Sequence, residues 1–319
     1  MSFVRTILGD VPADELNRCG AHEHIIIDAR YIAEKHPNFL LDDIDAACVD
    51  LREFRDSDGG WVIDTMPTGA GRSGLKLATA SQQSGVHIVC PTGLHLPLYY
   101  PPDHPVLSMD RDELVALFVR EIVEAISDGV GPLPYRAGIV KVAGNHGQLT
   151  AHQREAFAAA AETSHRTGCP IITHTEQGTA GEEQIQLLLE GGAQPRHVVL
   201  SHTDRRPDIA YHRALLSTGV MLEYDHHFRS YLKDGTCPAA DLISALAPEF
   251  PEQIVVGMDL ARRTYWHGHG GKPGLVWLLT VLPSLLRERG VNDELIERIL
   301  ILNPRRAFAF SAAAEGAGA

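Results

Sequence analysis

Side chains that can bind metal stand at the ends of apolar runs along this sequence. The clearest case is AHEHIII (21–27), in which His22 and His24 are two residues apart. Alternation along a strand would put both imidazoles on one face and Glu23 on the other. Neutral imidazoles on one face suit Zn, Mn, Fe, Co or Ni. The pair therefore indicates a metal site, and two core histidines bonded to the backbone are the alternative.

Three more polar side chains close apolar runs further along the chain. His174 stands in PIITHTE, His202 in HVVLSHTD, and Asp259 ends QIVVGMD. A lone carboxylate after such a run is costly to bury unless it is paired or bound to a cation. Each histidine alone is more readily explained as structural. Together with the first pair, these side chains predict a metal centre.

Lys141 lies inside GIVKVAGNHG (138–147), an apolar run with no neighbouring acid. Its side chain could reach solvent, pair with Asp259 without any metal, or take part in chemistry. An ammonium group has only donors and cannot ligate a metal, but a lysine in a dry pocket loses its proton as its pKa falls. The neutral amine can then react with carbon dioxide to form a carbamate that bridges two metals. We interpret Lys141 as such a bridge.

Eight short strand patterns must position these groups. They cover 21–27, 61–67, 86–93, 137–144, 170–176, 197–204, 219–225 and 253–259. Their near-continuous apolar character indicates strands covered on both faces. With helical patterns between them, they predict an α/β fold, a (β/α)8 TIM barrel whose chemistry gathers at the C-terminal ends of the strands. An open doubly wound sheet is the alternative, but no GxGxxG follows the first strand.

Helical patterns cover 112–126, 151–168 and 273–290. Gly168 suits the position just after a helix end, and Pro283 predicts a kink in the third helix. No linker or low-complexity segment divides the chain. We therefore predict a single domain over 1–319, made of an N-terminal segment (1–19), the barrel (20–310) and a flexible tail (311–319).

Composition limits the classes of partner. The formal net charge of -13 argues against nucleic acid but allows a small anionic substrate held by local arginines. The five cysteines are dispersed without a CxxC pair, which suits a reducing compartment. The chain start lacks an apolar signal core, and no run reaches the roughly 18 apolar residues of a membrane span. We predict a cytoplasmic protein without a membrane partner, and a homodimer is compatible with the sequence.

The motifs GAHEHI, KVAG, ITHT, LSHTD and GMD, in this order, resemble those of the phosphotriesterase family of the amidohydrolase superfamily. The resemblance extends from ILGDV near the start to NPRRAFAF (303–310). It implies two divalent metals, with zinc expected and Mn, Co, Fe or Ni as alternatives. The implied ligands of the more buried metal are His22, His24, Lys141 and Asp259. Lys141, as a carbamate, would bridge to a second metal held by His174 and His202.

Such a site implies metal-assisted hydrolysis of an ester-like bond. Divalent cations lower the pKa of bound water, so a hydroxide that bridges two metals would be the nucleophile. Asp259 would shuttle the proton. His226, in YDHH, resembles the histidine that relays protons in phosphotriesterases. Phosphotriesters, lactones and carboxylic esters all fit this chemistry, so the loops must set the specificity.

Basic residues follow the last two strands. Arg262 and Arg263 come after Asp259, and Arg229 and Lys233 follow strand 219–225. Barrels often bind phosphate at these loops, and guanidinium suits that anion. Pairing with surface acids is the alternative. The run MD-ARR-YW-GG-PG resembles the branch that hydrolyses lactones of sugar acids, some of them phosphorylated, so we predict such a lactone as the substrate.

One loop departs from the family pattern. In TGLHLPLYYPP, His95 stands where many relatives have a substrate-orienting tyrosine, and Tyr99 or Tyr100 could supply that hydroxyl. The alternatives are a phosphotriesterase, an arylesterase, an acyl-homoserine lactonase and a non-catalytic scaffold. A deaminase of the superfamily is disfavoured because its usual single-metal pattern has no strand 4 lysine.

Overall fold

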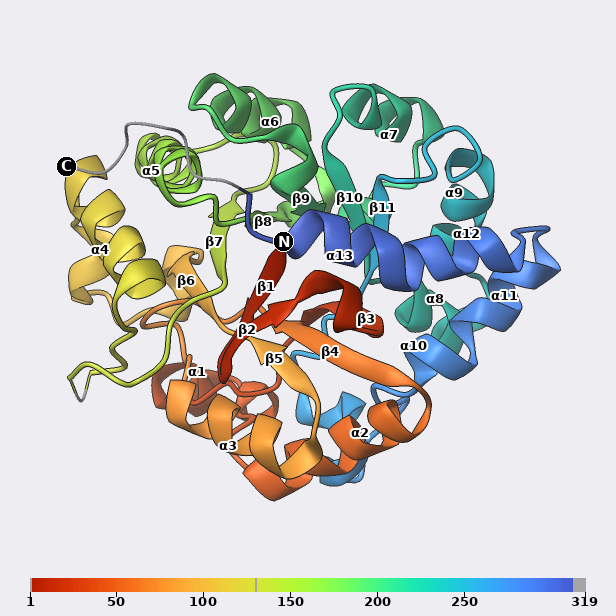
Figure 1. The fold of residues 1–319 in the computed structure, drawn as a ribbon, viewed down its shortest axis with the longest axis horizontal. Helices are drawn as coiled ribbons and strands as arrows, with labels where there is room; N and C mark the ends of the chain where they lie inside the picture. The colour runs from red at the N-terminus through yellow and green to blue at the C-terminus, as the bar shows by residue number, and fades with distance from the viewer. Residues whose placement is uncertain (1, 130, 312–319) are drawn as a thin grey trace.

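Parallel strands surrounded by helices make up this computed structural model, which describes residues 2–129 and 131–311 (Figure 1). Apart from Ser311, the predicted flexible tail lies outside the described residues. The strands of the barrel are β3 (Arg18–Glu23), β4 (Gly59–Asp64), β5 (His87–Val89), β6 (Pro91–Leu94), β7 (Ile139–Gly144), β8 (Ile171–Thr175), β9 (Val198–Ser201), β10 (Met221–Tyr224) and β11 (Ile254–Val256).

Hydrogen bonds order these strands into β3-β4-β5 and β6-β7-β8-β9-β10-β11, and each pair of neighbours is parallel. The two sheets form one barrel. β5 and β6 follow each other directly, so the predicted third strand is one strand with a break. At the other seam, the Asp259 N–H donates to the His22 carbonyl at 2.8 Å. The predicted barrel is confirmed, with all eight strands in the predicted order.

The helices are α1 (Arg30–Lys35), α2 (Ile44–Asp56), α3 (Gly74–Ser84), α4 (Arg111–Val123), α5 (Ala151–Thr167), α6 (Gly181–Glu190), α7 (Ile209–Leu216), α8 (His227–Asp234), α9 (Pro238–Leu246), α10 (Trp277–Thr280), α11 (Leu282–Glu288), α12 (Asp293–Glu297) and α13 (Asn303–Phe308). α5 ends at Gly168, which is left-handed (φ 73°) as predicted. The pattern over 273–290 forms two helices, and Pro283 lies in the first turn of the second, which begins at Leu282. None of the described helices is both long and apolar enough to span a membrane.

A two-stranded hairpin closes the bottom of the barrel, where the sequence predicted only a leading segment. It pairs β1 (Phe3–Thr6) with β2 (Gly9–Pro12). Figure 1 shows this hairpin and α13 across the near end of the barrel. Phe308 of α13 packs edge to face on buried Trp61, and Phe3 stacks on Phe310 with ring centroids 5.0 Å apart. Burying such a side chain stabilises the fold by about 1.5–3 kcal/mol, so the first strand and the segment 308–310 together close the bottom of the barrel.

Alternation along the strands separates the core from the chemistry. Ile139, Ile172 and Val199 pack together inside the barrel, on β7, β8 and β9. Two residues further along, on the same face, stand Lys141, His174 and Ser201. Apolar side chains thus fill the lower barrel, and the polar side chains lie above them at the carboxyl ends.

Candidate metal centre

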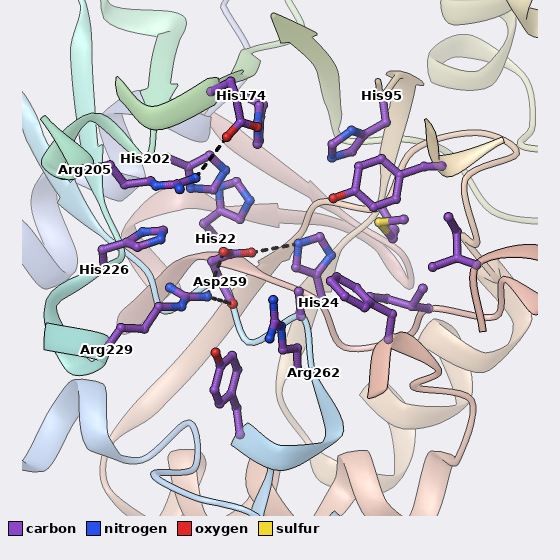
Figure 2. Close-up of a pocket in the computed structure, with 18 residues that line it drawn as sticks. His22, His24, His95, His174, His202, Arg205, His226, Arg229, Asp259 and Arg262 are labelled. Atoms are coloured by element: carbon purple, nitrogen blue, oxygen red, sulfur yellow. Dashed lines mark hydrogen bonds and ion pairs between the residues drawn. The ribbon is translucent and has the colours of Figure 1, made fainter. Parts of the chain in front are cut away.

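The mouth of the barrel holds a pocket of about 290 Å³, a volume that suits a small molecule. The four histidines predicted as ligands, from three strands, line it together with Asp259 from a fourth (Figure 2). Lys141 does not line the pocket; it lies beneath the histidines and is completely buried. All six predicted metal ligands are therefore brought to one end of the barrel: His22, His24, Lys141, His174, His202 and Asp259.

His22, His24 and Asp259 form the first half of the cluster. One potential ligand atom from each lies within 4.8 Å of the other two. His24 Nε2 is 3.1 Å from Asp259 Oδ1, and Lys141 Nζ is 3.4 Å from His22 Nε2. A register shift between Gly20 and Glu23 bends this end of β3. The first strand therefore needs a bulge to bring its histidines to the pocket, and this bend was not evident from the HxH spacing.

His174 and His202 form the second half. Their ring centroids are 4.6 Å apart, and His202 is equally close to His22. His202 and Asp259 both adopt left-handed backbone conformations, with φ of 62° and 46°. Such conformations cost of order 1–3 kcal/mol for residues other than glycine, and they gather at functional sites. Both side chains are aimed into the pocket by turns that the fold must hold in place.

Carboxylates fix the orientation of two imidazoles. His202 Nδ1 lies 2.6 Å from Asp225 Oδ2, and His174 Nε2 lies 3.0 Å from Glu176 Oε2. Each carboxylate accepts from one ring nitrogen, so the other nitrogen is the one available as a ligand. Burial lowers the pKa of His174 to about 4, and it therefore stays in the neutral form that binds metal near pH 7.

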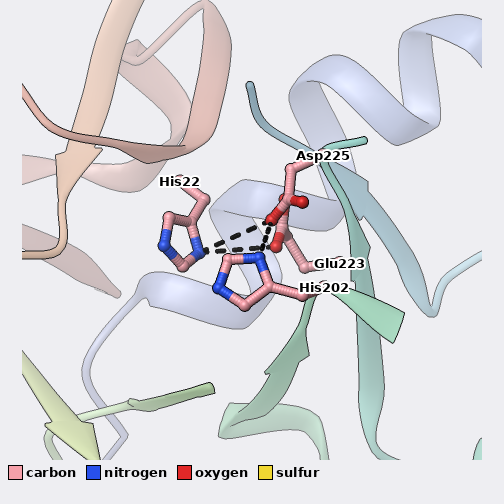
Figure 3. Close-up of side chains that lie close together, drawn as sticks. All are labelled: His22, His202, Glu223 and Asp225. Carbon is pink, nitrogen blue, oxygen red and sulfur yellow. Dashed lines mark hydrogen bonds and ion pairs between the residues drawn. The ribbon is translucent and has the colours of Figure 1, made fainter. Parts of the chain in front are cut away.

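Asp225 is the acid at the centre of the cluster (Figure 3). Its Oδ1 also accepts from His226 Nδ1 at 2.6 Å. Burial alone would raise the pKa of Asp225, but His202 and His226 hold it well below its usual range. Burial and the adjacent Asp225 raise the pKa of Glu223 well above its usual range. Asp225 is thus the charged partner of the histidines, whereas the shift in the pKa of Glu223 favours its neutral form.

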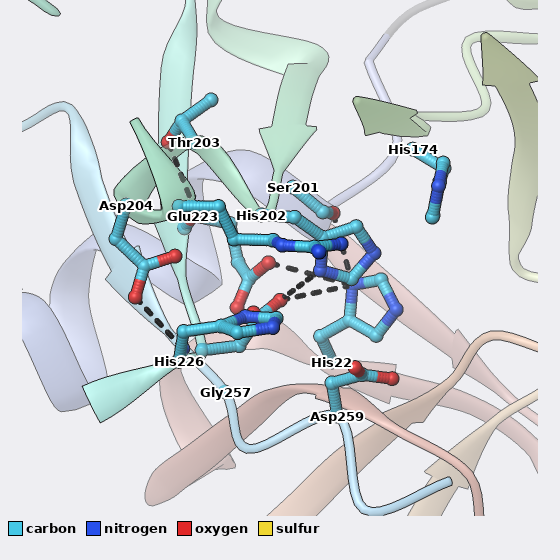
Figure 4. Close-up of polar contacts among 12 residues, drawn as sticks. His22, His174, Ser201, His202, Thr203, Asp204, Glu223, His226, Gly257 and Asp259 are labelled. Atoms are coloured by element: carbon cyan, nitrogen blue, oxygen red, sulfur yellow. Dashed lines mark hydrogen bonds and ion pairs between the residues drawn. The ribbon is translucent and has the colours of Figure 1, made fainter. Parts of the chain in front are cut away.

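Asp204 and Ser201 complete the polar contacts below the pocket (Figure 4). Asp204 Oδ2 accepts the backbone N–H of His226 at 2.7 Å, which fixes the turn after β10. Ser201 Oγ lies 2.9 Å from His22 Nδ1. His22 therefore turns its Nδ1 towards the barrel wall and its Nε2 towards Lys141.

Lys141 shows neither the ion pair with Asp259 nor the reach to solvent that the sequence left open. The polar atoms within hydrogen-bonding reach of its Nζ are His22 Nε2 and the Thr173 carbonyl, each at 3.4 Å. Desolvation by burial lowers the pKa of Lys141 to about 8. The amine therefore has a substantial neutral fraction near pH 7–8.

The donors present fit divalent metal. Four buried imidazoles and a carboxylate converge on one small volume, and converging acceptors without a cation are costly to desolvate. Imidazole and carboxylate are ligands that zinc and related ions accept. The cluster can therefore bind metal.

Three arginines reach the same pocket: Arg205, Arg229 and Arg262. Arg229 Nη2 pairs with Asp259 Oδ2 at 2.8 Å, and Arg205 Nη1 pairs with Glu176 Oε1 at 3.3 Å. The Arg262 guanidinium lies 5.2 Å from the centre of the Phe39 ring. Within the described part of the chain, no carboxylate lies within 4.0 Å of Arg262. Of the three, Arg262 is the one available to an anion.

Other predicted substrate-binding residues divide into two groups. His95 lines the pocket, as does His226. Lys233 is exposed on α8, Arg263 turns towards His269, and neither is among the described residues that line the pocket. Tyr100 is buried behind the pocket, where its hydroxyl accepts the His95 backbone N–H at 2.9 Å, and Tyr99 takes the place at the wall.

Sequence reasoning missed Asp225, Glu176 and Arg205 as parts of the site. Each lies within three residues of a predicted ligand or proton relay, in YDHH, ITHTE and LSHTDR. A search for carboxylates and cations directly after each barrel strand would have found all three.

Replacing Asp225 with asparagine is expected to weaken metal binding about 10- to 100-fold, because the amide keeps only one acceptor oxygen and turns a donor towards either His202 or His226. Competition with a chelating dye measures this affinity. Unchanged competition would show that Asp225 does not orient the imidazoles.

The chain was compared with known protein families, and the phosphotriesterase family matches residues 2–308. A phospho-furanose lactonase of Mycoplasmopsis synoviae is 32% identical over 97% of this chain and 92% of its own. Among solved structures, an amidohydrolase from Mycoplasma synoviae superposes with a TM-score of 0.91 at 30% identity, covering 98% of this chain and 93% of its own. A lactonase from Listeria monocytogenes gives 0.88 at 28% identity, covering 97% of this chain and 99% of its own.

Proposed function

Because this chain belongs to the phosphotriesterase family, we propose that it is a lactonase that opens a small phosphorylated sugar lactone. The chain is a hydrolytic enzyme that acts on ester bonds. The observation that carries the choice of substrate is Arg262, a pocket arginine without a carboxylate partner in the described residues, beside the metal-binding cluster. A phospho-furanose lactonase among the relatives supports the same substrate class.

We propose two divalent metals, with zinc first. His22, His24, Lys141 and Asp259 would hold one of them, and Lys141, His174 and His202 the other. When bound, the cations lower the pKa of a bound water and polarise the ester carbonyl. Carbamylation of Lys141 would turn a buried amine into an anionic ligand, and its hydrogen-bonding contacts with His22 Nε2 and the Thr173 carbonyl, neither of them a carboxylate, support that assignment.

Asp259 is proposed to take the proton from the attacking water. Burial alone would raise its pKa, but Arg229 and His24 hold the pKa of Asp259 well below its usual range. The carboxylate therefore stays charged at neutral pH, and it lines the pocket within reach of a substrate. His226, at the wall of the same pocket, would pass the proton to solvent.

His95 is proposed to take the place of the tyrosine that many relatives have. Its Nδ1 accepts the Leu96 backbone N–H at 2.7 Å. The proton of the neutral ring then lies on Nε2, and the ring is part of the pocket wall. Nε2–H is available to donate to the lactone carbonyl or to a hydroxyl of the substrate. Arg229 and Arg262 complete the proposed substrate contacts, with Tyr99 in place of Tyr100.

His95→Phe is expected to lower kcat/KM roughly 10-fold, because a neutral hydrogen bond contributes about 0.5–1.5 kcal/mol. His95→Gln keeps an N–H donor and should retain most of the activity. Steady-state kinetics on the best lactone measure both variants. Equal losses in the two variants would assign His95 a packing role.

A panel of furanose lactones tests the proposal. Each lactone is supplied with and without a phosphate group to metal-reconstituted protein, and a pH indicator reports hydrolysis. A nitrophenyl phosphotriester and a nitrophenyl carboxylic ester are included. Preference for phosphorylated lactones supports the proposal. Preference for the triester would favour the second candidate, a phosphotriesterase. An uncharged triester could pack on the apolar wall of the pocket, which is made of Ile27, Ile32, Phe39 and Met66.

Location and assembly stay predictions: a cytoplasmic protein, with neither nucleic acid nor membrane as a partner, and compatible with a homodimer. The division into segment 1–19, barrel 20–310 and tail 311–319 is likewise proposed.

A further inference from the structure

One buried carboxylate outside the pocket fastens the loop after β11 to helix α2. Asp50, in the middle of α2, is 0% exposed. It accepts three backbone N–H groups, from His267 at 3.1 Å, Gly268 at 2.9 Å and Leu275 at 3.2 Å. All three donors belong to the segment 260–275. Backbone N–H groups of the loop 260–275 therefore surround the carboxylate that helix α2 supplies.

Asp50 is an unusual residue for the buried side of a helix. Aspartate is a poor helix former, and burying a carboxylate is expensive unless donors surround it. Among the described residues, the hydrogen-bond donors to its side chain are these three loop N–H groups. The same side of α2 meets the loop closely at Gly268, where an added Cβ would lie 2.0 Å from the Ala46 carbonyl oxygen. The helix and the loop thus meet at a fitted contact.

Internal hydrogen bonds join the parts of the loop 260–275 to one another. Buried Trp266 donates from Nε1 to the Leu260 carbonyl at 2.6 Å. Backbone bonds then join Gly271 to Trp266, at 2.8 Å, and Gly274 to Tyr265, at 2.9 Å. Because these bonds tie the α2 side of the loop to the pocket side, a displacement at one side is transmitted to the other.

The pocket side of the loop carries Arg262 and Tyr265. Arg262 lies over Phe39, from the loop after β3, and reaches into the pocket beside Asp259 (Figure 2). Asp50 lies on the opposite side of the loop and is not among the described residues that line the pocket. Its influence on a substrate must therefore act through the backbone of the loop.

We infer that Asp50 is a positioning residue for recognition of an anionic substrate, because it fixes the loop that presents Arg262. This inference rests on the proposed function, since it assigns a supporting residue to the same substrate class. It places part of the specificity of the site on a helix that does not touch the ligand.

Asp50→Asn tests the inference on a furanose lactone with and without phosphate. The amide keeps one acceptor oxygen but replaces the other with a donor facing backbone N–H groups. KM for the phosphorylated lactone should rise roughly 10- to 100-fold from misplacement of Arg262. The kcat value, the bound metal and the KM for the unphosphorylated lactone should stay as in the parent.

Two further variants keep the test decisive. Gly268→Ala displaces the loop without changing any charge, and it should give the same split in KM even if Asp50→Asn fails to fold. Asp45→Asn removes an exposed acid from the same helix and serves as the matched control. Equal losses on both lactones, or loss of metal, would reduce Asp50 to a general structural role and overturn the inference.

Combination with Arg262→Ala separates this inference from the proposed function. If Asp50 acts through Arg262, Asp50→Asn should add little to the effect of Arg262→Ala. If Arg262→Ala weakens use of the phosphorylated lactone while Asp50→Asn and Gly268→Ala do not, the inference fails and the proposed function stands. If Arg262→Ala itself has no effect, phosphate recognition at this loop fails, and the role of Asp50 fails with it.

Discussion

Lys141→Ala is expected to lose bound metal and activity together. The side chain is completely buried at the floor of the pocket, and its Nζ faces His22 Nε2 rather than a carboxylate. If Lys141 is the anionic bridge, alanine removes a ligand from both metals. We expect less than one equivalent of metal per chain and a loss in kcat/KM on the order of 10³-fold or more. Metal analysis and lactone kinetics on the same sample measure the two effects.

The assignment of Lys141 as a carbamate leads to two further expected results. Reconstitution of the parent protein should need bicarbonate as well as metal. Added short carboxylic acids should partly rescue the alanine variant, because they can occupy the space that the side chain leaves. Lys233→Ala, which removes an exposed lysine, is the control. An alanine variant that stays fully metallated and active would show that Lys141 has only a structural role.

Arg262→Ala is expected to separate phosphorylated from unphosphorylated lactones. Hydrogen bonds to a charged group contribute about 1.5–3 kcal/mol, which corresponds to roughly 10- to 150-fold in kcat/KM. The whole loss should fall on the phosphorylated lactone, because the unphosphorylated one offers no anion to Arg262. Kinetics on the matched pair of lactones measure the difference.

The neighbouring residue offers a matched control. Arg263 carries the same charge on the same loop but turns towards His269, away from the pocket. Arg263→Ala should therefore leave both substrates close to the parent values. If the two variants behave alike, the loop contributes only general positive charge, and the assignment of phosphate to Arg262 is wrong.

The barrel could be predicted because parallel strands buried on both faces leave apolar runs, and eight of these recur along the chain. The positions of the candidate metal ligands followed from the same pattern, since each lies within or beside one of these runs. The hairpin of β1 and β2 was missed because its strands are four residues each and one of them has no fully buried residue. The break after Thr280 was expected only as a kink, although Pro283 lies in the first turn of a new helix there.

Loop residues could not be placed from the sequence with the same success. Arg262 and Arg263 are adjacent in sequence and equal in charge, and only the turn after Asp259 decides which of them enters the pocket. The same holds for Tyr99 and Tyr100. Asp225 is next to the predicted His226, but its role was missed because its partner His202 lies 23 residues away in the chain. Such pairs depend on how the ends of two strands meet.

The stack of Phe3 on Phe310 has a practical consequence. These residues also share a backbone bond, from the Phe310 N–H to the Phe3 carbonyl at 2.8 Å, on the end of the barrel away from the pocket. Attachment of the enzyme to a solid support near either residue would leave the mouth of the barrel facing the solution. The same proximity makes the protein a candidate for circular permutation, in which a short linker joins these two positions and new ends are opened elsewhere.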